Sequence, residues 1–207
     1  MKARRKTSEK TNDSARKGRG AAGILERLAP EEGNAILRLL LEEHPELRTE
    51  AEQLATDVIG ASSQEVADNL YHRLIGVDLD ALNERAGAHS WGYVEPSEAG
   101  WELLEEEVDD FVSDMKRKAE LGLISAAETV CAGIVEGLYR ARNIQSDGAL
   151  GWAPDFPAEK AFSVIKDFLE SSEPAARGPA QNRLKEALSV STPEWMDIVV
   201  RAIGEQG

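Results

Sequence analysis

Residues 96–143 constrain the fold most, because they carry the signals of two helices joined by a tight turn. Apolar residues recur every three or four positions in both halves, which places them on one face of each helix. Between the halves, Gly122 is suited to the left-handed conformation that ends a helix. Ser125 and Glu128 have the spacing of a capping box that would open the second helix. A turn of three or four residues makes the two helices antiparallel neighbours, so the sequence predicts a central helical hairpin.

The chain from residue 21 onward repeats the same helix signals. Proline, serine or aspartate stands before an amphipathic stretch, and glycine often follows it; the predicted starts are Pro30, Pro45, Ser62, Asp78, Pro96, Pro157, Pro174 and Pro193. The helix from Pro174 is expected to be interrupted at Gly178-Pro179, so that its stable part begins near Pro179. Residues 88–95 and 144–156 read as irregular loops. No segment alternates apolar and polar residues over a strand's length. We therefore predict an all-α fold of about nine or ten helices, arranged as antiparallel helical hairpins in a repeat-like array or an irregular bundle.

Charge divides the chain into two parts. Residues 1–20 hold eight Lys or Arg and two Asp or Glu, which gives this segment a net charge of +6. Because the whole chain has a net charge of −14, the remaining residues carry −20. The first twenty residues also lack apolar side chains that could build a core, so we expect a disordered basic arm. Residues 21–207 are expected to form a single domain with the hairpin at its centre.

The arm has two interpretations. Its basic residues could bind nucleic acid or an acidic protein surface, and the candidates for such contacts are Arg4, Arg5, Lys6, Arg16, Lys17 and Arg19. The alternative is a solvated tail with no function. An acidic body repels nucleic acid over most of its surface, so any nucleic-acid contact is expected through residues 1–20 only.

Several classes of protein are disfavoured by what the sequence lacks. No apolar run approaches the ~20 residues that span a bilayer, and the basic start is not followed by the apolar segment of a signal peptide. The one cysteine, Cys131, excludes an internal disulfide and a cysteine-based zinc site, and its apolar neighbours indicate a buried thiol. We expect no membrane association and a cytoplasmic location.

Candidate catalytic and metal-binding residues are sparse. The histidines His44, His72 and His89 match neither H-E-x-x-H nor the E-x-x-H element of carboxylate-bridged metal sites. We therefore assign no catalytic residue, cofactor or metal. An α-helical enzyme that uses scattered acids with His72 or His89 remains a less favoured alternative. The acidic run at 105–110 is interpreted as a solvated helix face, with a cation site or a contact for a basic partner as alternatives.

Aromatic residues gather in the two predicted loops. Trp91 and Tyr93 lie in the first, and Trp152 and Phe156 lie in the second. Large rigid aromatic side chains are favoured at protein interfaces, so these four residues are the candidate partner-binding surface. The alternative is that they cover the hydrophobic core.

The succession of capped amphipathic helices over residues 21–207 resembles helical-repeat proteins of the HEAT and TPR type, although no 34- or ~40-residue period and no TPR consensus occur. The resemblance implies a surface that binds another protein and carries no catalytic residues. We expect a non-enzymatic protein-interaction or scaffold domain. The alternative is a nucleic-acid-associated accessory protein that docks through its basic arm.

Overall fold

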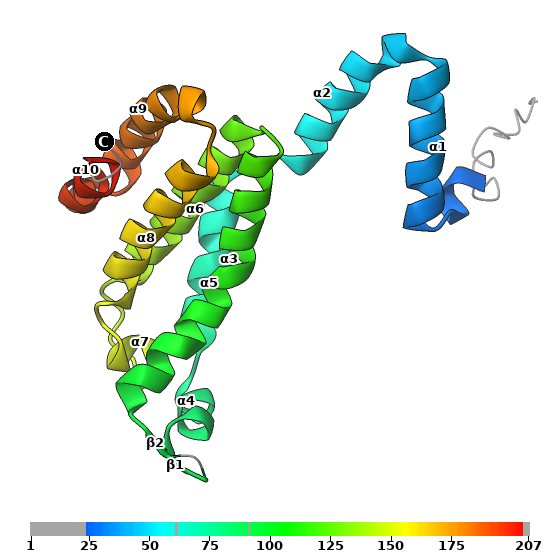
Figure 1. The fold of residues 1–207 in the computed structure, drawn as a ribbon. Coiled ribbons are helices and arrows are strands. Elements are labelled where there is room, and N and C mark those ends of the chain that lie inside the picture. Colours follow the sequence, from blue (N-terminus) through cyan, green and yellow to red (C-terminus); the bar gives the residue numbers. More distant parts are fainter. Residues whose placement is uncertain (1–23, 61, 91, 205–207) are drawn as a thin grey trace, which may run out of the picture. The chain divides into compact units, whose positions relative to one another are not determined.

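The computed structural model describes residues 24–60, 62–90 and 92–204 (Figure 1). The chain divides into two compact units, residues 1–54 and 55–207, and each is considered by itself. The division falls inside the region expected to be one domain. The predicted arm at residues 1–20 lies outside the described residues.

The predicted all-α class is confirmed. The α-helices of the described residues are α1 (Pro30–Glu43), α2 (Arg48–Ile59), α3 (Ser63–Gly76), α4 (Leu79–Arg85), α5 (Pro96–Glu120), α6 (Ile124–Ala141), α7 (Ala149–Trp152), α8 (Phe156–Ser171), α9 (Pro174–Ser191) and α10 (Met196–Gly204). Short 3-10 turns form η1 (Ile24–Arg27), η2 (Pro45–Leu47) and η3 (Pro193–Trp195), and a two-stranded sheet forms β1 (Gly87–His89) and β2 (Gly92–Val94).

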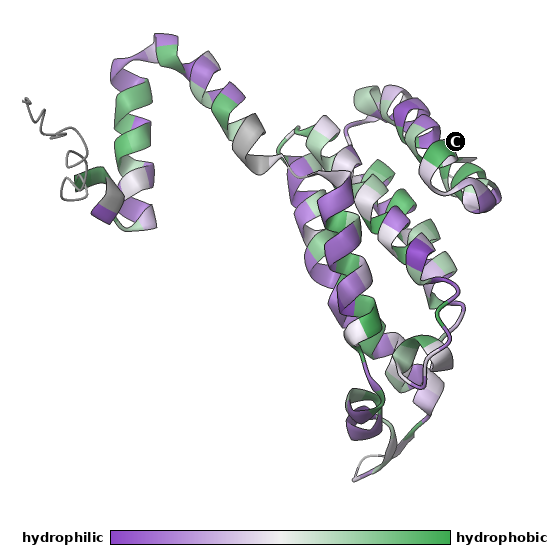
Figure 2. Ribbon diagram, turned by 180° about the vertical axis from the view of Figure 1, so that it is seen from behind, coloured by the Kyte–Doolittle hydropathy of each residue, from purple (hydrophilic) through white to green (hydrophobic). Residues whose placement is uncertain are grey.

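The first unit has no buried side chain among its described residues, 24–54. Helix α1 starts as predicted with Pro30 at its first position, and the Glu32 carboxylate accepts a hydrogen bond from the Ala29 N–H at 2.9 Å. Ile36, Leu37 and Leu40 nonetheless remain more than two-fifths exposed. Figure 2 shows this hydrophobic stretch in the middle of α1.

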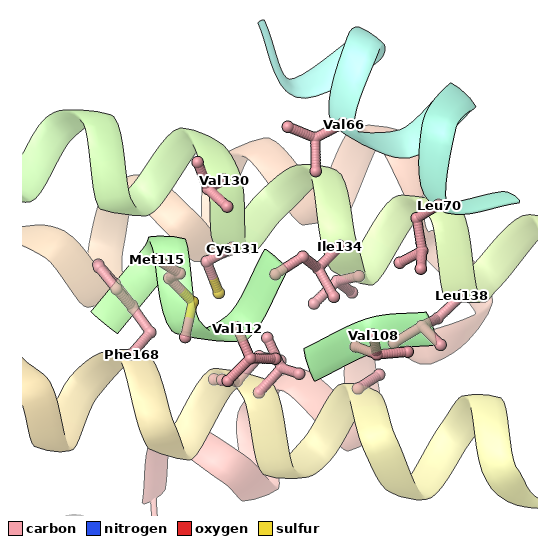
Figure 3. Close-up of a cluster of buried hydrophobic side chains, with 14 of the residues drawn as sticks. Val66, Leu70, Val108, Val112, Met115, Val130, Cys131, Ile134, Leu138 and Phe168 are labelled. Carbon is pink, nitrogen blue, oxygen red and sulfur yellow. The ribbon is translucent and has the colours of Figure 1, made fainter. Parts of the chain in front are cut away.

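The second unit is built around α6. This helix packs against α3, α5, α8 and α9. Its buried positions are Ala127, Val130, Cys131, Gly133, Ile134, Val135, Gly137, Leu138 and Ala141. Together with side chains of α3, α5 and α8 they form the main hydrophobic cluster, part of which is drawn in Figure 3.

The central hairpin is confirmed as α5 and α6. Gly122 has φ +76°, the left-handed conformation predicted for it, and its N–H donates to Ala119 O at 2.9 Å. The predicted capping box at Ser125 is wrong, because the N-cap of α6 is Leu123, two residues earlier. The Glu128 carboxylate instead binds Arg183 of α9 at 2.7 Å.

Two glycines let α3 approach α6 closely. A Cβ atom at Gly133 would lie 2.6 Å from Val66 Cβ and from Ser63 O, and one at Gly137 would lie 3.0 Å from Ala67 O. Only a residue without a side chain fits such a contact. The order of these pairs along both helices shows that α3 and α6 run parallel.

Two other predictions differ from the structure. Residues 88–95, expected to be a loop, contain the antiparallel hairpin β1–β2, in which Ala88 pairs with Tyr93. Strands of three residues are too short to show an alternating pattern. Helix α9 begins at Pro174, as predicted, but it continues through Gly178 and Pro179 without the predicted interruption. Gly178 explains this continuity, because a residue without Cβ avoids the clash that usually bars helix before proline.

The acidic run of α5 is largely ion-paired rather than simply solvated. Arg73 and Arg85 reach it from α3 and α4, and Lys160 reaches it from α8. The Arg85 guanidinium lies 2.8 Å from Glu106, and Lys160 Nζ lies 2.6 Å from Glu105. Hydrogen bonds to Glu106 and Glu102 raise the pKa of Arg85, which stays protonated. These pairs connect α5 to three neighbouring helices, and those between solvent-exposed side chains contribute only about 0–1 kcal/mol each.

Candidate functional site

The connection between α6 and α8 forms two adjoining hollows at one end of the second unit. Figure 1 shows that α4, α7 and the β1–β2 hairpin gather at this end, whereas the α5–α6 turn lies at the opposite end. The larger hollow has a volume of about 740 Å³ and is lined only by residues of the segment 142–154. The smaller one has a volume of about 410 Å³ and adds Leu79 of α4 and Trp152 of α7.

Close backbone contacts fix the shape of this segment. A Cβ atom at Gly151 would lie 1.9 Å from Ser146 O, and one at Gly148 would lie 2.3 Å from Val77 O. The Ala149 N–H donates to Val77 O at 3.2 Å, which anchors α7 beside the start of α4. The backbone that forms the walls of both hollows is therefore held by close contacts, which are possible because Gly148 and Gly151 have no Cβ atom.

Two large apolar side chains stand exposed at the smaller hollow. Trp152 is 49% exposed and Leu79 is 42% exposed. Their neighbours Leu150 and Phe156 are buried in the core, so the exposure is specific to these two positions. A half-exposed tryptophan beside an exposed leucine is typical of a contact surface.

Arg142 forms the polar wall of the larger hollow. Its guanidinium carbon lies 3.5 Å from the centre of the Tyr139 ring, and its Nη1 donates to Tyr139 O at 2.6 Å. Its Nη2 donates to Glu194 at 3.0 Å. Its Nε–H is buried and has no hydrogen-bond partner among the described residues. Buried donors without a partner are rare in folded proteins.

The four predicted partner-binding aromatics separate into three groups. Trp152 and Tyr93 are exposed, at 49% and 63%. Phe156 is not available to a partner: it is fully buried and its ring packs edge-on against Trp101 with 5.0 Å between centroids. That expectation is corrected, because Phe156 is the first residue of α8 and lies in the core, as the alternative interpretation held. Trp91 lies outside the described residues.

The predicted nucleic-acid contacts of the arm also lie outside the described residues. These are Arg4, Arg5, Lys6, Arg16, Lys17 and Arg19. The structure adds Leu79, Arg142 and Asp147 to the candidate site. Leu79 looked in the sequence like one of the core positions of a short helix. No sequence pattern indicated that Arg142 and Asp147 would line a hollow.

The groups considered for catalysis lie apart from the hollows. The His72 ring packs edge-on against Tyr71, and His89 Nε2 lies 2.9 Å from Arg85 O. Cys131 is fully buried in α6, and burial raises the pKa of its thiol well above its ordinary value. Within residues 24–60, 62–90 and 92–204, no group of three or more His, Cys, Asp or Glu side chains could hold a metal ion.

No helix in the described part of the chain is both long enough and apolar enough to cross a bilayer. Comparison of the chain with protein-family models, with curated proteins and with solved structures finds no match.

Proposed function

We propose that the unit of residues 55–207 is a protein-binding domain that captures a segment of another protein in the hollows beside Trp152. The observation that carries this proposal is that Trp152 and Leu79 are exposed side by side in the lining of the smaller hollow. The backbone that forms this hollow is held in place by close contacts at glycines. Such a surface offers a large apolar contact area and loses little conformational entropy on binding. A preformed groove of this kind suits an apolar anchor residue of a partner.

The lining of the hollows favours binding over catalysis. Their only ionisable side chains are Arg142, which is already paired with Glu194, and the exposed Asp147. Acid–base or nucleophilic catalysis requires a nucleophile and base, or an acid and base, within hydrogen-bond reach of each other. Ser146 and Asp147 line both hollows, but no hydrogen bond joins these two described residues. The lining also holds backbone and amide groups that suit a bound peptide.

Substitution of Trp152 tests the proposal. The full chain is used to select ligands from a phage-displayed random peptide library, and the selected peptides are titrated against variants by fluorescence anisotropy. Trp152→Ala should weaken binding by at least about tenfold, because a central aromatic residue of an interface contributes about 2 kcal/mol or more. Its circular dichroism at 222 nm should remain that of the wild type.

A matched pair of leucines provides the control. Leu79→Ala should weaken the same peptides, whereas Leu121→Ala should not. Leu121 is 58% exposed, but it lies at the α5–α6 turn. Equal affinity of the wild type and the Trp152 variant for every selected peptide would exclude the proposed surface.

The charge separation in the sequence supports a second candidate function, nucleic-acid association through residues 1–20. Deletion of residues 1–20 should then abolish binding to a 30-base-pair DNA duplex. The affinity of the full chain should fall steeply between 50 and 200 mM salt, because each neutralised phosphate releases counterions. Salt-independent binding, or binding that survives the deletion, would contradict this function.

A further inference from the structure

The carboxylates around the hollows differ from those of α5 in having no Lys or Arg partner among the described residues. Asp147 lines both hollows, Asp78 and Asp80 flank Leu79, and Asp155 follows the lining residue Pro154; all four are exposed. Within the described part of the chain, none of the four has a Lys or Arg at ion-pair distance. The acids of α5, in contrast, are held by Arg73, Arg85 and Lys160.

Positive charge is correspondingly scarce at this end. Arg142 is the only cation that lines either hollow, and Glu194 already accepts a hydrogen bond from it at 3.0 Å. The sequence of residues 55–207 contains 28 Asp or Glu against 13 Lys or Arg. The surface around the exposed apolar pair therefore attracts cations and repels anions.

From this charge complementarity we infer that the partner segment is basic: an apolar side chain packs on Trp152 and Leu79, and flanking Lys or Arg residues pair with Asp80 and Asp147. The inference rests on the proposed function and specifies the chemistry of its partner.

A neutral or acidic segment would fit less well. Either segment would leave the four carboxylates without a cationic partner, and an acidic one would also bring negative charge toward a body that is already acidic. Complementary rim charges act mainly on the association rate and on its dependence on salt. A basic partner should therefore bind faster at low ionic strength.

The composition of selected peptides is the first test. The full chain is screened at 50 mM salt against a phage-displayed library of random 12-residue peptides. Trp152-dependent peptides should be enriched in Lys and Arg beside an apolar residue. Their association rate should fall as the salt concentration rises to 300 mM.

Removal of two rim charges is the second test. The double variant Asp80→Asn, Asp147→Asn should weaken the selected peptides by about tenfold, because each exposed ion pair contributes up to about a fivefold change in affinity. Asp78 is left intact because its side chain caps α4 by accepting from the Ala81 N–H at 3.0 Å. The control variant Glu120→Gln, Glu186→Gln removes the same net charge from exposed positions on α5 and α9 and should change affinity less than twofold.

The outcomes separate the inference from the proposed function. The inference of a basic partner would be overturned if the Trp152-dependent peptides show no excess of Lys or Arg. It would also be overturned if they bind the Asp80→Asn, Asp147→Asn variant and its control with equal affinity. Either result would leave the proposed function standing. Failure to select any Trp152-dependent peptide would overturn both.

Discussion

Replacement of Phe168 by alanine should lower the free energy of unfolding by about 3–5 kcal/mol. Phe168 of α8 is fully buried, and it belongs to the same core cluster as Met115 and Cys131 (Figure 3). Loss of its ring removes a large apolar area and leaves a cavity that close-packed neighbours fill only in part. Urea unfolding followed by tryptophan fluorescence measures the change, since all four tryptophans lie in residues 55–207.

Phe111 is the matched control for this substitution. It lies on α5 at the edge of the core, partly exposed, with the Arg73 guanidinium 5.0 Å from its ring centre. Phe111→Ala should therefore cost clearly less than Phe168→Ala. Equal losses for the two variants would mean that α8 does not pack as the structure shows.

Replacement of Gly133 by alanine should lower the free energy of unfolding by about 1–3 kcal/mol, the usual cost of overpacking a core. Taken alone, this exchange favours a helix by about 1 kcal/mol, so the sign of the change reports on the tertiary contact. The new methyl group would lie 2.6 Å from both Val66 Cβ and Ser63 O, and α3 would have to move away from α6. The same fluorescence-detected urea titration gives the result.

Other glycines provide a graded control for Gly133. Gly137→Ala should cost less, since its nearest neighbour would be at 3.0 Å, and Gly76→Ala at the end of α3 should be neutral or stabilising, since it meets nothing within 4 Å. A stabilising Gly133→Ala substitution would be incompatible with the close packing of α3 on α6.

Local signals in the sequence predicted the helices of the second unit well. The helix starts at Ser62, Asp78 and Pro96 and the left-handed Gly122 all occur as expected, because each acts through its own backbone and near neighbours. Ser125 lost its capping role because the turn after Gly122 lets α6 start earlier.

The candidate site was only partly predictable. Trp152 stood out as an aromatic residue in a loop, but Phe156 had the same signature and is buried, because the difference lies in the packing of α8 on Trp101. Leu79 and Asp147 are 68 positions apart in the sequence, and the contact of Gly148 with Val77 that brings their segments together has no local signal. The resemblance to helical repeats stays a prediction.

The central claim is that partners bind at the end of the second unit that carries α4 and α7. The most direct measurement is the ¹H–¹⁵N correlation spectrum of the full chain, titrated with a peptide selected from the library. We expect the shifted amides to cluster in residues 77–82 and 142–154, and those of α9 and of the α5–α6 turn to stay unchanged. Shifts centred on α1 or on α9 and α10, with none in residues 142–154, would contradict the central claim.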